Sequence, residues 1–324
     1  MFYESENDMI YISSFIINLV LMLTLMPIYI KLLKKLNYNQ VVSEYSLDEY
    51  KDKQKTPIMG GLLFILFPII VCILLVSDIM YDINLLICIF AYIMYGLIGF
   101  VDDYTVITKG KNEGLKASTR LILQFILALV FVYVYLTNNE TSYLLVSSNM
   151  FYLVFYLIIA FIMFAGTTNA VNITDGMDGL AGGCALVSLG AFTIIAYSLG
   201  HSNLVVFLVG VIGSLVGYLR YNHFPAQIFM GDTGSNALGG LLAAIALVLH
   251  KEFLLVIIGG IFVWEVMCVI IQISSVKLRG KRVFKYTPIH YSFVISGYKE
   301  KVVVYGFWLL STVLALVGIF INFL

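Results

Sequence analysis

The sequence predicts an all-α, polytopic membrane protein with ten transmembrane helices, and its composition and hydropathy support this fold class. Of its 324 residues, 61% are hydrophobic and only 12% are charged, whereas a soluble domain is about 45–50% apolar and about 25% charged. The apolar residues gather in runs long enough to cross the roughly 30 Å hydrocarbon core of a bilayer. This composition excludes a soluble enzyme, a disordered chain and a nucleic-acid-binding protein.

Each long apolar run is expected to form one spanning helix, within a few residues at each end. The eighth run is short, and the ninth is long enough to bend at Gly259–Gly260. The first run has no basic start and no small-residue cleavage site, so we expect a retained span rather than a signal peptide. We expect residues 1–324 to form one membrane domain. The expected spans are 11–32, 57–77, 84–101, 119–137, 148–166, 180–199, 203–219, 237–250, 253–276 and 302–323.

The basic residues predict how the chain is oriented in the membrane. Of the 19 lysines and arginines, all except Lys251 fall in or beside the odd-numbered connections between spans. Connections rich in Lys and Arg stay in the cytoplasm. We therefore expect the odd-numbered loops to be cytoplasmic and both termini to be extracytoplasmic, with the active site on the cytoplasmic face.

The polar side chains that are candidates for catalysis or binding lie in these cytoplasmic connections. Asp102 and Asp103 stand together at the end of the third span. Two carboxylates there are costly unless a positive group meets them, and a solvated helix end is the plainer interpretation. Lys53, in the first connection, belongs either to an ordinary positive flank or to a basic lip for a phosphate-bearing substrate.

The fifth connection carries acids and amides without any basic residue. Asn169, Asn172, Asp175 and Asp178 recur at every third position, so on a helical turn they would form one polar stripe. Gly176 and the glycines after it would let a ligand or another helix approach the backbone closely. Because a purely structural role does not readily explain this pattern, we expect the loop to bind a substrate.

The seventh connection ends in residues 231–235 (Gly-Asp-Thr-Gly-Ser), just before an apolar helix. This segment is either a plain N-terminal cap or a site that offers the Asp232 carboxylate to Mg²⁺ and backbone N–H groups to phosphate. Asn222 and Phe229 precede it. The Phe229 ring either packs locally or stacks on a flat base.

The ninth span and the connection after it add three polar residues. His290 follows a basic cluster, although a lone histidine is usually structural. Glu265 and Gln272 are seven residues apart inside the span and so lie near one helical face. Polar groups within a span are functional candidates by default, and pairing with a neighbouring helix is the alternative.

The acidic residues of the cytoplasmic face suit Mg²⁺, which prefers carboxylates and substrate phosphates. With basic residues nearby, they predict Mg²⁺-assisted phosphoryl transfer between a soluble diphosphate donor and a lipid-borne acceptor. An ion-coupled carrier is the alternative from another class, but carriers keep acids near the bilayer midplane, where this chain has only Glu265. The acids are Asp102, Asp103, Asp175, Asp178 and Asp232.

Five segments resemble the polyprenyl-phosphate N-acetylhexosamine-1-phosphate transferase family, and within it the branch that acts on phospho-N-acetylmuramoyl-pentapeptide. The resemblance covers nearly the whole chain, and the segments of the fifth and seventh connections are highly specific. The segments are Lys53…Thr56-Pro57…Met59-Gly60-Gly61, Asp102-Asp103, residues 169–180 (Asn-Ala-Val-Asn-Ile-Thr-Asp-Gly-Met-Asp-Gly-Leu), residues 229–235 (Phe-Met-Gly-Asp-Thr-Gly-Ser) and Pro288-Ile289-His290.

The resemblance implies transfer of phospho-N-acetylmuramoyl-pentapeptide from its UDP donor to undecaprenyl phosphate, giving lipid I and UMP in peptidoglycan synthesis. It implies a homodimer in the lipid bilayer of the bacterial plasma membrane, a Mg²⁺ ion at Asp232, and Asp102 as the group that deprotonates or orients the lipid phosphate. The implied catalytic residues are Asp102, Asp103, Asp232 and His290. The implied substrate-binding residues are Lys53, Asn172, Asp175, Gly176, Asp178, Asn222, Phe229 and Gln272, with Phe229 stacked on uracil.

Several positions depart from the family's pattern. His290-Tyr291-Ser292 stands where three histidines are usual, and Ile58 stands where a threonine is usual. Val106 and Ser118 replace lysines. The reaction class does not depend on these positions, but the choice of sugar does, and the nearest alternative is an N-acetylglucosamine-1-phosphate transferase of the teichoic-acid or O-antigen type. The candidate substitutes for the missing lysines are Lys109, Lys111 and Lys116.

Overall fold

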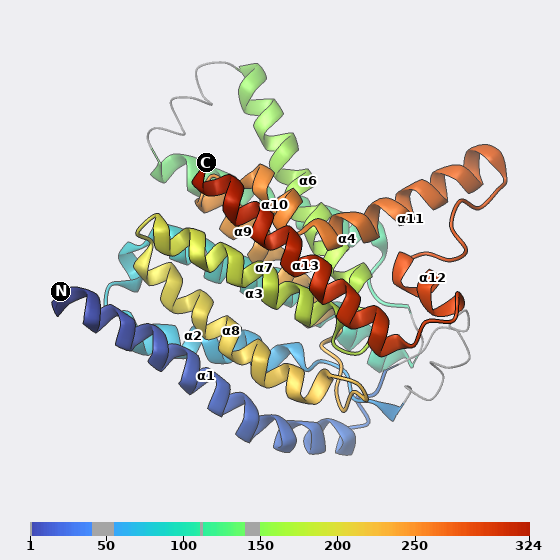
Figure 1. Ribbon diagram of the computed structural model, residues 1–324, viewed down its shortest axis with the longest axis horizontal. Helices are drawn as coiled ribbons and strands as arrows, with labels where there is room; N and C mark the ends of the chain where they lie inside the picture. Colours follow the sequence, from blue (N-terminus) through green and yellow to red (C-terminus); the bar gives the residue numbers. More distant parts are fainter. Residues whose placement is uncertain (1, 41–54, 111–112, 140–149) are drawn as a thin grey trace.

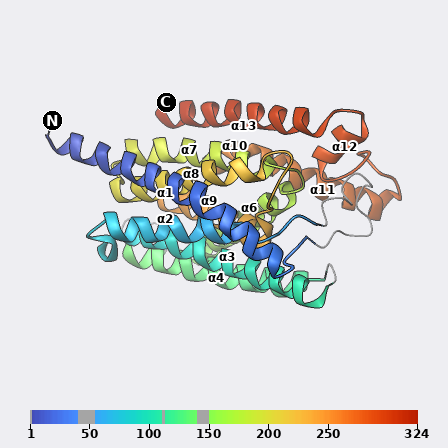
Figure 2. The same ribbon diagram turned by 90° about the horizontal axis from the view of Figure 1, so that it is seen from below.

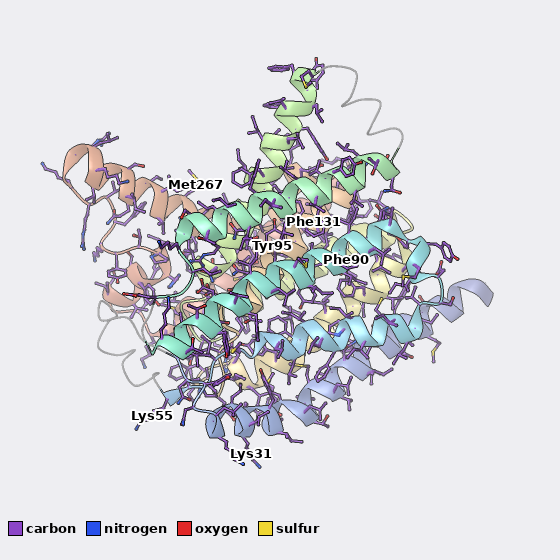
Figure 3. All side chains as sticks on the ribbon, turned by 180° about the vertical axis from the view of Figure 1, so that it is seen from behind. Lys31, Lys55, Phe90, Tyr95, Phe131 and Met267 are labelled. Atoms are coloured by element: carbon purple, nitrogen blue, oxygen red, sulfur yellow. The ribbon has the colours of Figure 1, made fainter. Side chains whose placement is uncertain are left out.

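The computed structural model describes residues 2–40, 55–110, 113–139 and 150–324, and their regular secondary structure is helical. Within these ranges the only β pairing is a single bridge between Asn39 and Pro57. Apolar side chains cover the outside of the helices (Figure 3): Phe90 is 52% exposed, whereas Tyr95 is completely buried. Exposed apolar side chains along long helices are typical of a surface that faces lipid. The prediction of an all-α, polytopic membrane protein is confirmed.

Among the described residues, eight helices are long and apolar enough to cross a membrane. They are α1 (Phe2–Lys35, qualifying from Asp8), α3 (Ile83–Lys109), α4 (Ala117–Asn138), α6 (Met150–Thr174), α7 (Leu180–Ser198), α8 (Ser202–Asn222), α11 (Gly260–Arg279) and α13 (Glu300–Phe323). The other helices of the described ranges are α2 (Gly61–Leu75), the 3₁₀ helix η2 (Ile79–Tyr81), α9 (Gly231–Val248), α10 (Glu252–Ile258) and α12 (Ile289–Ile295).

Three expected spans differ from the helices that form. The second span shortens to α2, because the chain before Gly61 bonds to the segment that leads into α9 instead of continuing the helix: Gly60 N donates to Phe229 O at 2.8 Å. The ninth span breaks at Gly259 into α10 and α11, which confirms the expected bend. The eighth expected span forms helix α9, which begins at Gly231 rather than at residue 237, so Asp232 lies in its first turn.

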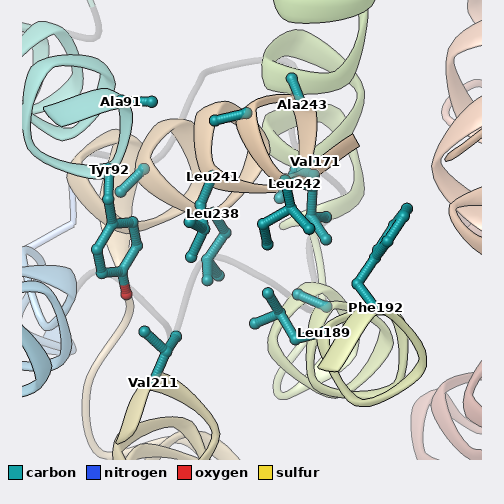
Figure 4. Packing of buried hydrophobic residues seen from close by; sticks show 14 of the residues in the cluster. Ala91, Tyr92, Val171, Leu189, Phe192, Val211, Leu238, Leu241, Leu242 and Ala243 are labelled. Carbon is teal, nitrogen blue, oxygen red and sulfur yellow. The ribbon is translucent and has the colours of Figure 1, made fainter. Parts of the chain in front are cut away.

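Helix α9 forms the centre of the bundle. All of its residues except Asp232 are buried, and its most extensive packing is against α3. Figure 4 shows Leu238 and Leu242 of α9 between Tyr92 of α3 and Leu189 of α7. Small residues let neighbouring helices approach closely. A Cβ atom added to Gly239 would lie only 2.5 Å from the Thr168 Cα of α6.

The remaining helices surround this core and define two ends. In Figure 2 both chain termini lie toward one end of the bundle, whereas α12 lies at the opposite end. Helix α11 and the first half of α6 lean away from the bundle (Figure 1). The C-terminal end of α3, the N-terminal end of α9 and the C-terminal end of α6 meet where the polar residues of the candidate site gather.

Candidate active site

Asp103 caps the N-terminus of α9 from the neighbouring helix α3. Its side chain is 3% exposed. Its Oδ1 accepts a hydrogen bond from Asp232 N at 3.0 Å, and its Oδ2 accepts from Thr233 N at 2.9 Å and from Thr233 Oγ1 at 2.6 Å. Unpaired N–H groups at a helix N-terminus favour such a negative charge. Asp103 therefore fixes the position of Asp232.

The Asp232 carboxylate is held between a cation and an amide. Its Oδ2 lies 2.9 Å from Arg120 Nη1 of α4, and its Oδ1 accepts from Asn172 Nδ2 of α6 at 2.7 Å. The same Asn172 amide also donates to Ser235 Oγ at 3.0 Å. Three helices thus converge on one carboxylate, which explains how the fold brings Asn172 and Asp232 together.

Asp102 anchors the loop that leads into α4. Its Oδ1 accepts from Leu115 N at 2.9 Å, and the carboxyl is 6% exposed. A Cβ atom added to Gly114 would lie 2.2 Å from Asp102 Oδ2, so glycine lets the loop pass close to this carboxyl. Asp102 and Asp232 are neighbours whose charges repel. Asp102 therefore contributes charge to the site and also sets where α4 begins.

These groups line a cavity of about 650 Å³. Ligand sites in proteins commonly have volumes of about 300–1,000 Å³. The wall carries carboxylates beside three basic side chains, so it suits an anionic ligand together with a cation. The charged and amide residues of the wall are Asn39, Gln40, Asp102, Asp103, Lys109, Glu113, Lys116, Arg120, Asn172 and Asp232.

The predicted polar stripe over residues 169–178 is wrong in its second half. Helix α6 ends at Thr174, and the chain then turns through Gly179, whose φ of +79° favours glycine. Only Asn169 and Asn172 remain on one helical face, and Asn169 Nδ2 donates to Gln124 Oε1 at 3.0 Å. Asp175 lies just after the helix.

Asp178 and Asn222 are buried and hold two loops together. Asp178 Oδ2 accepts from Ala226 N at 2.9 Å. Asn222 Oδ1 accepts from Gly179 N at 3.0 Å, and its Nδ2 donates to Ile228 O at 2.9 Å. Both side chains therefore shape the segment that carries Phe229.

Phe229 belongs to an extended segment beside the chain that precedes α2. Its N donates to Pro57 O at 2.9 Å, and its O accepts from Gly60 N. The side chain is half-buried. Lys53, which the sequence places near this segment, lies outside the described residues.

His290 is buried against the loop that follows α6. Its Nδ1 lies 2.9 Å from Glu265 Oε1, while its Nε2 has no hydrogen-bond partner among the described residues. A Cβ atom on Gly176 would lie 2.4 Å from that Nε2. Tyr291 Oη donates to Gly176 O at 2.9 Å, and burial raises the pKa of Tyr291, so its phenol stays protonated. His290 and Gly176 are thus brought together.

Gln272 holds the connection after α11. Its Oε1 accepts from Val283 N and Phe284 N at 3.0 Å, and its Nε2 donates to Phe284 O at 3.2 Å. It lines a second cavity of about 420 Å³ with Lys277 and Arg282. In this structure Gln272 therefore acts on the loop backbone, and it is not among the residues that line the cavity around Asp232.

Arg120 is the residue in contact with Asp232 that the sequence analysis did not single out. The sequence offers lysines as substitutes for the charges missing at Val106 and Ser118, but the cation that contacts Asp232 among the described residues is Arg120. These partners are separated by 112 residues. The available signal was weak: an arginine in the first turn of the helix that follows the Asp102-Asp103 pair.

The oxygen ligands of the cavity fit Mg²⁺. Within the described ranges no group of three or more His, Cys, Asp or Glu side chains could hold a metal ion. Mg²⁺ does not need such a cage, because it keeps several waters and binds through one or two carboxylates plus substrate phosphates. Asp102 and Asp232 could offer such carboxylates, and Arg120 already places a positive charge against Asp232.

Comparison with known sequences defines the class of protein. Residues 85–250 match the family model of glycosyl transferase family 4, and the chain belongs to this family. Similar proteins named phospho-N-acetylmuramoyl-pentapeptide-transferase match along nearly the whole chain. This finding confirms the family predicted from the motifs.

Three of these relatives show the extent of the match. The protein from Oceanobacillus iheyensis is 40% identical over 304 residues, which cover 92% of this chain and 93% of the relative. The protein from Clostridium kluyveri is 42% identical over 300 residues, which cover 90% and 93%. The protein from Bacillus licheniformis is 37% identical over 321 residues, which cover 97% and 98%.

Proposed function

We propose that this protein transfers phospho-N-acetylmuramoyl-pentapeptide from its UDP donor to undecaprenyl phosphate, with Mg²⁺, and releases UMP. The observation that carries the proposal is the cavity in which Asp102 and Asp232 stand beside Arg120 and two lysines. Carboxylates and cations in one cavity suit a reaction in which Mg²⁺ and two phosphate-bearing substrates meet. The name of the relatives supports the transferred group, and the motif resemblance supports the undecaprenyl acceptor.

Each residue of the cavity then has a part in phosphoryl transfer. Mg²⁺ bound through Asp232 would neutralise charge on the donor diphosphate. Asn172 and Asp103 hold Asp232 in place, and Asp102 orients or deprotonates the acceptor phosphate. An oxygen of that phosphate forms a bond to the phosphorus attached to the sugar, the bond from this phosphorus to the UMP oxygen breaks, and UMP leaves.

The nucleotide end of the donor is proposed to lie along the loops after α6 and before α9. Asp175 and Gly176 would contact the donor directly, with Phe229 stacked on uracil and Lys53 at the basic lip. Asp178 and Asn222 would act by fixing these loops, because their side-chain atoms already bond backbone groups. Gln272 would act by holding the loop that leads to His290.

We further propose ten spans in a single membrane domain, with α2 and α9 completing the eight long helices and α10–α11 forming a broken ninth span. Both termini would then be extracytoplasmic and the cavity cytoplasmic. The lysines shown in Figure 3, Lys31 and Lys55, support this orientation, because basic residues mark the cytoplasmic side. The proposed location is the bacterial plasma membrane, and the proposed assembly is the homodimer that the resemblance implies.

The function is tested by UMP release from the purified protein with undecaprenyl phosphate and Mg²⁺. UDP-N-acetylmuramoyl-pentapeptide and UDP-N-acetylglucosamine are compared as donors, each with and without EDTA. We expect release from the muramoyl donor alone, and only without EDTA. Release from the glucosamine donor alone would overturn the sugar assignment, and release that persists in EDTA would overturn the role of Mg²⁺.

Phe229→Ala is expected to weaken binding of the UDP donor by about tenfold or more, because stacking on a base contributes roughly 1–3 kcal/mol. The KM for undecaprenyl phosphate should change little. Separate titrations of the two substrates measure the difference, and Phe229→Tyr, which keeps an aromatic ring, should retain most donor binding. Equal weakening for both substrates would contradict a uracil contact.

A further inference from the structure

Arg120 has one acidic partner among the described residues, and that partner is the proposed metal ligand. Its Nη1 lies 2.9 Å from Asp232 Oδ2, with the Arg120 side chain 23% exposed and that of Asp232 27% exposed. A guanidinium carries five N–H donors in a planar fork. Only the bond to Asp232 is formed with a side chain of the described residues, so Arg120 can bind a further anionic group.

Arg120 is placed at this carboxylate by the rest of the site. Asp102 binds Leu115 N and thereby fixes the loop that begins α4. Arg120 lies in the first turn of α4, where its N donates to Lys116 O at 3.0 Å. The backbone is therefore held, while the long, partly exposed side chain stands in the cavity wall.

Arg120 and a divalent cation compete for Asp232. Both carboxylate oxygens are already engaged, Oδ1 by the neutral Asn172 amide and Oδ2 by Arg120. Two positive groups on one carboxylate repel each other. A divalent cation bound at Asp232 would therefore compete with the guanidinium, which stands in the same cavity wall as Lys109 and Lys116.

We propose that Arg120 is a substrate-binding residue that occupies Asp232 in the metal-free protein and binds a substrate phosphate when Asp232 holds a divalent cation. The proposal rests on the proposed function, because it takes Asp232 as the metal ligand. The anionic partner is a phosphate, which either the UDP donor or the lipid acceptor supplies. The planar guanidinium suits two parallel hydrogen bonds to phosphate oxygens better than a lysine does.

The proposal predicts opposite effects on metal and substrate binding. In the purified protein without substrates, Arg120→Gln should bind Mn²⁺ roughly two- to fivefold more tightly, because the competing ion pair is gone. In the transfer assay the same variant should raise the KM for the donor or for undecaprenyl phosphate by about tenfold or more. Mn²⁺ titration by electron paramagnetic resonance gives the first quantity, and separate substrate titrations identify which phosphate Arg120 binds.

Three further variants make the test specific. Arg220→Gln removes the same charge at the end of α8, where Arg220 lies over the Tyr221 ring, and should leave Mn²⁺ affinity unchanged. Arg120→Lys keeps the positive charge but loses the planar set of guanidinium donors. It should bind Mn²⁺ like the wild type and still raise the KM for the substrate whose KM rises in Arg120→Gln. Asp232→Asn should lose Mn²⁺ binding altogether.

The outcomes separate this proposal from the proposed metal site. If Asp232→Asn still binds Mn²⁺, the metal assignment fails. If Asp232→Asn loses Mn²⁺ but Arg120→Gln binds it no more tightly than the wild type, the competition is refuted. If Arg120→Gln tightens Mn²⁺ and changes neither KM, the phosphate contact is refuted.

Discussion

Asp232→Asn is expected to lower transfer activity by at least about 100-fold in a protein that stays folded. The substitution removes the negative charge that a metal ion requires while preserving the shape of the side chain. An asparagine oxygen can still accept the Asn172 amide, and the helix N-terminus at Asp232 N remains capped by Asp103. The ion pair to Arg120 is lost, but a partly exposed pair contributes only about 0–1 kcal/mol. Stability should therefore change little.

The matched control for this variant is Asp82→Asn, at the other end of α3. Asp82 Oδ1 caps that helix by accepting from Leu85 N at 3.0 Å, and asparagine caps helices equally well. We expect wild-type transfer from Asp82→Asn. Activity and thermal unfolding are measured for both variants in the same detergent, and near-normal turnover by a folded Asp232→Asn protein would contradict the metal assignment.

Gly99→Ala is expected to disrupt the active site by disturbing the packing of helix α3 against helix α9. An added Cβ would lie 1.9 Å from Asp232 O and 2.2 Å from Asp232 C. These are backbone atoms of α9, so no side-chain rotation can relieve the overlap. Helices α3 and α9 must separate, which also pulls Asp103 away from the N–H groups that it caps.

The expected cost of Gly99→Ala is roughly 1–3 kcal/mol of unfolding free energy, the usual range for overpacking. Transfer should fall by about 100-fold, because displacement of about 1 Å at a catalytic group has that effect. Gly190→Ala in α7 is the control, since its added Cβ meets no atom within 4 Å and alanine favours helix. Thermal unfolding and UMP release are measured for both variants. A Gly99→Ala protein as stable and as active as Gly190→Ala would contradict the close contact between α3 and α9.

Hydropathy by itself determined the membrane class and most of the helices. A long apolar run forms a helix in lipid wherever it occurs, because its backbone groups have no other partners there. The break at Gly259 was also predictable from the local sequence. Local patterns were less reliable where tertiary bonds compete: α9 begins early because Asp103 caps it, and α6 ends before Asp175, so the continuous polar stripe does not form.

The sequence motifs named Asp102, Asp103, Asn172 and Asp232 as candidates, and these four residues line one cavity. Only the tertiary structure decided what each of them does there. Asp103 bonds a helix end 129 residues away, and Arg120 reaches Asp232 across 112 residues. Such partners depend on where helices cross, and a crossing is set by packing between distant segments, which no local pattern of hydropathy or spacing records.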